Sequence, residues 1–302
     1  MVKRPASVPP PVADRIDQYV SSVEERLCSS RETSKVVQEI LARLHGDGDL
    51  YDRWRAGESV TQPEQLRLDA YHPRNALTQA DEWAEKDEET FRESKALGWL
   101  WHGFDASVLS DNLALAFPFR QMLADHLFAE AGDDLRLFGG ITFPYGHNIE
   151  IGDRTVVHEE AVLDDRGKLA IGSGVSIADG AALHSHRHDI VEQDDVSIYR
   201  TVVEDDVRLG SEAAVAAGCR IGRNAMVGTR AVVRGDVPAH HVAVGIPAES
   251  VRVKPGWQSV AEEPGSLEVN REDRRIEYEL PEEVDTVEEF GRDLEPPDQT
   301  EG

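Results

Sequence analysis

Three histidines within five residues are the side chains of this sequence best suited to chemistry. His184, His186 and His188 occupy alternate positions of the segment LHSHRHD at 183–189. A neutral imidazole, with an ordinary pKa of about 6.5, can take a proton from a poor nucleophile as that nucleophile attacks. Alternate residues of an extended chain point to one side, so the three rings can face the same space. The segment predicts a general base among them; zinc ligation and a solvated loop are the alternatives.

A six-residue period in the second half of the chain indicates what positions these histidines. Aliphatic residues recur every six positions, and small residues recur four positions after them. The aliphatic series is Val203, Leu209, Val215, Ile221, Val227 and Val233, and the small series is Val207, Ala213, Cys219, Ala225 and Ala231. An amphipathic helix has no six-residue period, and a β-sandwich would space its strands by about 8–12 residues. A coil of short strands repeats in this way, because each turn presents the same shape to the same layer.

Two breaks in the period bear on function. The aliphatic phase starts at Ile151, slips by two residues at 164–167, and is interrupted over about 184–200. The slip places Asp165 at a turn of the coil. The longer interruption places His184 at a corner, beside a loop that could cover a substrate.

The remaining segments predict four parts of the chain. Residues 1–11 are rich in proline and predict a disordered N-terminus. Apolar residues at helical spacing, first at Ile16, Val20, Val23 and Leu27, predict a helical region over 12–132, including a helix over 79–96. The coil occupies 133–255. Residues 256–302 predict a solvated acidic tail, in which 275–280 could form an edge strand.

Composition limits the partners and the compartment. The 302 residues include 58 Asp and Glu against 32 Lys and Arg, a formal net charge of −26. Such a surface would repel nucleic acid and anionic membranes, and it favours a high-salt cytoplasm where salt screens the self-repulsion. The two cysteines argue against a disulfide framework. We expect neither a secretory signal nor a membrane span, because no apolar stretch approaches the roughly 20 residues a span needs.

Four segments resemble the hexapeptide-repeat acyltransferases. They are LGSEAAV at 209–215, IGRNAMVG at 221–228, VAVGIPA at 242–248 and FPYGHNIEIG at 143–152, the last being similar to the maltose and galactoside O-acetyltransferase branch. The resemblance covers about residues 111–253. It implies a mainly β fold, a left-handed parallel β-helix preceded here by an α-helical N-terminal region. It also implies a homotrimer with active sites between subunits, acetyl-CoA as cosubstrate, and no metal.

The resemblance further implies an acetyltransferase that transfers the acetyl group of acetyl-CoA to a hydroxyl of a sugar-like small molecule. His184 matches the family's catalytic histidine, which acts as general base without forming an acyl-enzyme. The positions matching acceptor-binding residues are Glu160, Asp165, Tyr145 and His186, and the positions matching CoA-binding residues are Ser211, Thr229, Arg234 and Arg252. Glu249 departs from the branch, which often has a cation there, and would repel the adenosine phosphate.

Two other functions remain open at the level of sequence. Gamma-type carbonic anhydrases share the left-handed β-helix and bind zinc through three histidines, for which His158, His184 and His188 are the candidates. The interval from His184 to His188 is one residue shorter than that family's pair. The other alternative is a noncatalytic β-helix scaffold with the helical region as its docking surface.

Overall fold

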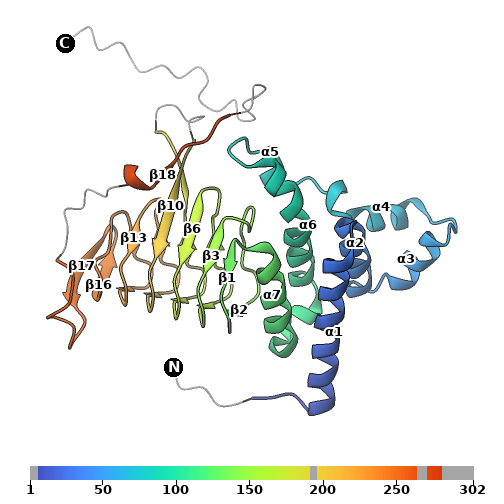
Figure 1. Cartoon of the computed structure of the whole chain (residues 1–302), viewed down its shortest axis with the longest axis horizontal. Helices are drawn as coiled ribbons and strands as arrows, with labels where there is room; N and C mark the ends of the chain where they lie inside the picture. The colour runs from blue at the N-terminus through green and yellow to red at the C-terminus, as the bar shows by residue number, and fades with distance from the viewer. Residues whose placement is uncertain (1–5, 191–195, 264–270, 281–302) are drawn as a thin grey trace, which may run out of the picture.

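The computed structural model describes residues 6–190, 196–263 and 271–280, in which an α-helical region lies against one end of a β-helix (Figure 1). The helices are α1 (Pro10–Ser29), α2 (Thr33–Leu44), α3 (Gly48–Arg55), α4 (Gln62–Ala70), α5 (Gln79–Glu82), α6 (Glu88–Asp105) and α7 (Leu113–Leu127), with 3-10 turns η1 (Pro73–Asn75) and η2 (Val108–Asp111). No helix of the described residues is both long and apolar enough to cross a membrane. The ends of the predicted N-terminus and acidic tail, 1–5 and 281–302, lie outside these residues.

Amphipathic periodicity accounts for the helical region. The stripe of Ile16, Val20, Val23 and Leu27 is buried along α1, as the sequence predicts. The helix predicted over 79–96 is instead two helices, α5 and α6, separated by residues 83–87. The side chain of Asp87 accepts hydrogen bonds from the backbone N–H groups of Glu89 and Thr90, so it caps a new helix at this point.

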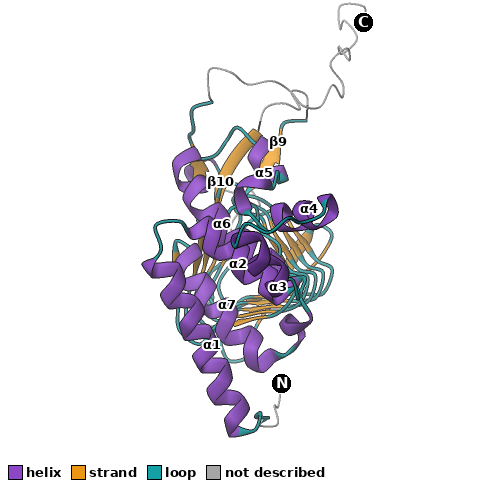
Figure 2. Ribbon diagram, turned by 90° about the vertical axis from the view of Figure 1, so that its right-hand side faces the viewer, coloured by secondary structure: helices purple, strands orange, loops and turns teal. Residues whose placement is uncertain are grey.

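The β-helix has three faces, and each face is a sheet whose strands come from successive turns of the coil. The first face contains β1 (Glu130–Ala131), β3 (Ile149–Ile151), β6 (Lys168–Ile171), β10 (Val196–Val203) and β13 (Arg220–Ile221). The second contains β2 (Arg136–Leu137), β4 (Val156–Val157), β7 (Ser176–Ile177), β11 (Arg208–Leu209), β14 (Met226–Val227), β16 (His241–Gly245) and the antiparallel β17 (Ala248–Val253). The third contains β5 (Val162–Leu163), β8 (Ala182–Leu183), β12 (Ala214–Val215) and β15 (Val232–Val233). This is the predicted left-handed parallel β-helix, about five turns long, viewed from its helical end in Figure 2.

The six-residue period corresponds to the interior of this coil. Strands of the coil contribute aliphatic side chains to stacks that stay in register from turn to turn, as Ile177, Leu209 and Val227 do on the second face. The small residues between strands, such as Ala213 and Cys219, are completely buried. The prediction of a periodic coil is therefore confirmed at the level of individual core positions.

Two of the three corners of the coil matter for the site. The second corner, which follows the second-face strands, stacks Glu160, Gly180, Glu212 and Arg230, all with positive φ. The third corner, which follows the third-face strands, stacks Asp164, His184, Ala216 and Arg234. Backbone N–H groups of the first three donate to the carbonyls of Leu183, Val215 and Val233 on the next turn.

The third corner carries both breaks of the period. The slip at 164–167 lies between β5 and β6. One turn later the chain leaves the coil as β9 (His186–His188), which pairs antiparallel with the start of β10. We call this pair the β9–β10 arm. On the other side of β10 lies β18 (Arg275–Ile276), which confirms an edge strand within 275–280.

A buried ion pair joins the helical region to this corner. Glu85, in the loop between α5 and α6, is bound by the guanidinium of Arg166 in the slip, and both side chains are almost fully buried. The Arg166 guanidinium also lies 4.2 Å from the ring centroid of Trp83, in cation–π geometry. The ion pair therefore fixes how the helical region approaches the corner that holds the histidines.

We predict that Glu85→Ala destabilises the protein by about 3–5 kcal/mol, because it leaves the Arg166 charge buried without its partner. The measurement is the free energy of unfolding in urea. Glu82→Ala, at an exposed carboxylate of α5, is the matched control and should change it by less than about 0.5 kcal/mol. Equal effects of the two substitutions would show that the ion pair does not hold the helical region in place.

Candidate active site

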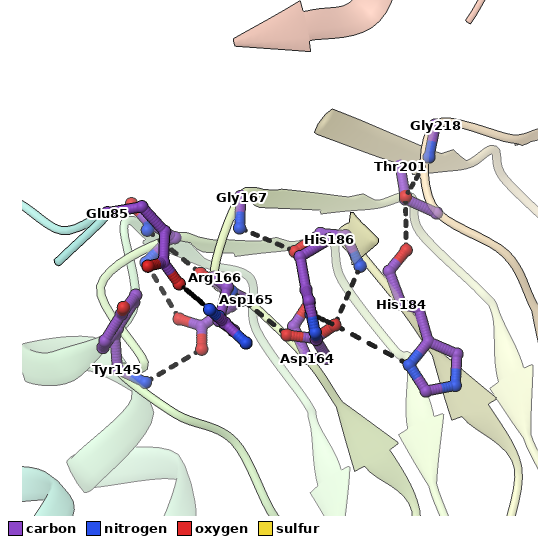
Figure 3. A network of polar contacts seen from close by, with 12 residues as sticks. Glu85, Tyr145, Asp164, Asp165, Arg166, Gly167, His184, His186, Thr201 and Gly218 are labelled. Atoms are coloured by element: carbon purple, nitrogen blue, oxygen red, sulfur yellow. Dashed lines mark hydrogen bonds and ion pairs between the residues drawn. The ribbon is translucent and has the colours of Figure 1, made fainter. Parts of the chain in front are cut away.

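The carboxylate of Asp164 holds two of the three histidines at the third corner (Figure 3). Its Oδ2 lies 2.5 Å from Nδ1 of His186 and 3.7 Å from Nδ1 of His184. The first contact is a short hydrogen bond, and the second lies just outside hydrogen-bonding distance and is electrostatic. The Asp164 side chain is 7% exposed, whereas that of His184 is 44% exposed. A buried carboxylate therefore faces an imidazole whose other edge is open to solvent.

The charge of Asp164 follows from its surroundings. Burial alone would raise the pKa of this carboxyl, but the side chains of His184 and His186 and the backbone N–H of Ser185 outweigh burial and lower the pKa. Asp164 is thus ionised throughout the neutral range. An ionised carboxylate beside Nδ1 favours the imidazole tautomer with its proton on Nδ1.

Backbone contacts fix the orientation of the histidine segment. The hydroxyl of Ser185 donates to the carbonyl of Asp164 (2.6 Å) and accepts from the N–H of Gly167 (2.8 Å). The hydroxyl of Thr201 donates to the carbonyl of His184 at 2.7 Å. A Cβ at Gly167 would lie 2.3 Å from the carbonyl oxygen of Tyr199, so only glycine allows the slip to pack this closely against β10.

Sequence and structure comparisons agree with this architecture. No model of a known protein family matches the sequence. The galactoside O-acetyltransferase of Escherichia coli (strain K12) is 27% identical over 137 residues, covering 44% of this chain and 68% of that protein. A chloramphenicol acetyltransferase of Escherichia coli is 32% identical over 130 residues, covering 36% of this chain and 60% of that protein. The crystal structure of a maltose O-acetyltransferase from Clostridium difficile 630 shares the fold, with a TM-score of 0.50, 22% identity, and coverage of 59% of this chain and 98% of that one.

The chain is therefore similar in sequence to acetyltransferases and has the β-helix fold of a hexapeptide-repeat acetyltransferase. It spans only about two thirds of the two relatives' lengths, 68% and 60%. In this chain the α-helical region precedes the β-helix.

Asp165 does not have the position that the sequence predicted for an acceptor ligand. It is completely buried, and its carboxylate accepts hydrogen bonds from the backbone N–H groups of Tyr145 (2.9 Å) and Asn148 (3.3 Å). It therefore supports the loop before β3 and has no surface to offer a ligand. The carboxylate beside the histidines is that of the neighbouring Asp164. The slip in the period does not by itself show which of the two aspartates faces the histidines.

Tyr145 and Glu160 are also placed differently from the prediction. Tyr145 is 2% exposed, and its ring packs against the rings of Trp83, Phe91 and His147. Glu160 is exposed at the second corner, away from the column of His184 within one chain. Of the four predicted acceptor ligands, only His186 lies beside His184. The side chains of His184 and His186 both face the carboxylate of Asp164.

The predicted CoA ligands fall into two groups. Ser211 and Thr229 lie on adjacent turns of the second corner, where the N–H of Arg230 donates to the carbonyl of Ser211. Arg252 belongs to β17 at the end of the second face. Arg234 instead shares the third corner with His184, two turns further along the coil. The structure therefore separates three of these residues from the histidine within one chain.

The three histidines proposed for zinc do not converge within one chain. His158 follows β4 at the second corner, where its ring stacks on Phe138, whereas His184 and His188 belong to the third corner and β9. Among the described residues no group of three or more His, Cys, Asp or Glu side chains could hold a metal ion. A shallow groove of about 360 Å³ lies on the first face, lined by residues that include Glu150, Glu204 and Arg223, and no histidine lines it.

The buried Asp165 gives a pH prediction. Burial raises its pKa to about 7, and the charge of Asp164 adds to this. Between its ordinary pKa of about 3.9 and about 7, the folded state holds a proton that the unfolded state has released, so this group makes stability fall as pH rises. We expect the stability of the wild type relative to Asp165→Asn to fall between about pH 4 and about pH 7. Urea unfolding at constant salt measures it.

Asp134→Asn makes the same change at an exposed carboxylate, and its stability difference from the wild type should not follow this pH dependence. A difference for Asp165→Asn that is constant or rises with pH would contradict the prediction.

Proposed function

We propose that this protein is an acetyl-CoA-dependent O-acetyltransferase that acts on a hydroxyl of a sugar-like small molecule, with His184 as general base. The observation that carries the proposal is the pairing of a half-exposed imidazole with a buried, ionised carboxylate at a β-helix corner. The relatives named galactoside O-acetyltransferase and chloramphenicol acetyltransferase support acetyl transfer to a small-molecule hydroxyl.

The mechanism follows from the orientation of the imidazole. With Nδ1 directed at Asp164, the lone pair of His184 is on Nε2. Nε2 takes the proton of the acceptor hydroxyl while the oxygen attacks the acetyl carbon, and the carbonyl electron pair moves to its oxygen. As the carbonyl re-forms, the C–S bond breaks, and the CoA thiolate takes the proton from the imidazolium. Asp164 stabilises the imidazolium between these two transfers.

The positions of the predicted donor ligands support a homotrimer. Within one chain His184 and Arg234 share the third corner, about 10 Å apart across two turns at the usual strand spacing. Ser211 and Thr229 belong to the second corner. One CoA molecule can contact both groups when the second corner of one subunit faces the third corner of its neighbour. The cosubstrate would then bind between subunits.

We predict that CoA binding stabilises the protein and that acetyl-CoA is consumed when a suitable acceptor is present. At a CoA concentration of about 100 times the Kd the stabilisation should reach about 2.7 kcal/mol. Thermal unfolding with CoA, followed by an acceptor screen that monitors free thiol, measures both. Because of the net charge of −26, the assays are run in concentrated potassium chloride and in dilute buffer. No stabilisation by CoA, and no turnover of any sugar or aryl alcohol in either buffer, would refute the proposal.

His184→Ala should lower kcat by at least ~100-fold, because it removes the base. Asp164→Asn should lower kcat by about tenfold or more with little change in the KM for acetyl-CoA, because it affects the imidazolium and not donor contacts. Steady-state kinetics measure both effects. His126→Ala, at a histidine of α7 that pairs with Glu24, is the control and should turn over normally. Near-normal turnover of folded His184→Ala would exclude it as the base.

A further inference from the structure

A C-terminal segment crosses the third corner beside the histidines. It consists of η3 (Glu272–Arg274) and β18, together with the residues on either side, and we call residues 271–278 the strap. In Figure 1 its strand β18 lies beside β10. Nothing in the six-residue period or in the family resemblance, which ends near residue 253, accounts for this position.

The strap is part of the same small sheet as the β9–β10 arm. β10 is the central strand, with β9 on one side and β18 on the other, and Ile198 of β10 is opposite both His186 and Ile276. The hydroxyl of Tyr278 donates to the carbonyl of Val196, at the start of β10. The strap therefore covers the edge of β10 that lies opposite β9, the strand that contains His186.

Arg274 fastens the strap to the coil. Its guanidinium makes a bidentate ion pair with Asp236, at 2.8 and 2.7 Å, and Nη1 also donates to the carbonyl of Gly218 at 2.7 Å. Arg274 is half-buried. Bidentate arginine–carboxylate pairs of this kind are strong and restrict geometry. Gly218 and Asp236 belong to the two turns of the third corner that follow the His184 turn.

The same residue, Gly218, is connected to His184 through the side chain of Thr201. The N–H of Gly218 donates to the hydroxyl of Thr201 at 2.9 Å, and that hydroxyl donates to the carbonyl of His184 at 2.7 Å (Figure 3). Thr201 is 1% exposed, so these hydrogen bonds are shielded from water. Arg274, Gly218, Thr201 and His184 form a continuous series of contacts from the strap to the imidazole-bearing residue.

The fit of the strap against Gly218 is close. Gly218 has a φ of +75°, and a Cβ at this position would lie 2.6 Å from Cγ of Arg271 in the strap. The corner thus has space for the strap because residue 218 has no side chain.

We propose that Arg274 is a positioning residue of the acetyltransferase, through which the strap sets the orientation of His184 and of the β9–β10 arm. The inference rests on the proposed role of His184 as base. Asp164 lies 3.7 Å from His184 and 2.5 Å from His186, so a small shift of either backbone changes which imidazole the carboxylate supports. Loss of the Arg274 contacts releases the backbone of Gly218 and the outer edge of β10. Displacements of about 1 Å at a base can cost up to about 100-fold in rate.

The experiment compares full-length Arg274→Ala, Arg274→Lys and the wild type. For Arg274→Ala we expect kcat to fall about 10- to 100-fold with the KM for acetyl-CoA unchanged. Arg274→Lys should recover part of the rate, because it keeps one charge near Asp236. Hydrogen exchange of the amides of residues 196–201 should accelerate in Arg274→Ala, whereas those of Val227 and Val233 in the coil should exchange as in the wild type.

The control is Arg43→Ala, which removes an arginine paired with Asp52 in the helical region and should change neither readout. Normal kcat in Arg274→Ala despite faster exchange, or a change in KM alone, would overturn the positioning role. Unchanged hydrogen exchange in Arg274→Ala would show that the Arg274 contacts do not hold β10 in place. Absence of acetyl transfer by the wild type would refute the proposed function, while the exchange measurement would still decide whether the strap holds the arm.

Discussion

Every turn of the β-helix must return the same core positions to the same three stacks, and the rest of the structure depends on this constraint. Ile177, Leu209 and Val227 lie in register at the centre of a close-packed column. An extra residue inside a strand would put a polar side chain into that column. Extra residues can therefore be inserted only at a corner of the coil. Both breaks of the six-residue period lie at the third corner, on consecutive turns. The same constraint that orders the core gathers Asp164 and His184 at one place.

Two adjacent aspartates at this corner have opposite electrostatic states because their partners differ. Asp164 faces imidazoles and a backbone N–H, which lower its pKa in spite of burial. Asp165 points into the protein, where burial raises its pKa to about 7. Titratable pairs with pKa values moved in opposite directions are typical of sites that handle protons. Here Asp164 supports His184, whereas Asp165 supports the loop before β3.

Additions to the β-helix surround the third corner from two sides. The helical region reaches it through the Glu85–Arg166 ion pair, and the strap reaches it through Arg274. Both contacts are charged and at least half-buried, so they restrict geometry more than an exposed pair would. Two segments outside the β-helix therefore contact the corner that holds Asp164 and His184.

The sequence predicted the fold of the coil, its core positions and the location of His184. It could do so because a strict six-residue period marks every core position, and an interruption of that period can lie only at a corner. The helix boundary at Asp87 and the choice between Asp164 and Asp165 could not be predicted. Each depends on which way a side chain points within a turn, and adjacent residues of a turn carry the same local signal. The Arg274 contact joins residues 38 positions apart, for which no local pattern exists. The sequence determined which segment of the chain carries the histidines. Only tertiary packing decided which neighbouring groups orient those side chains.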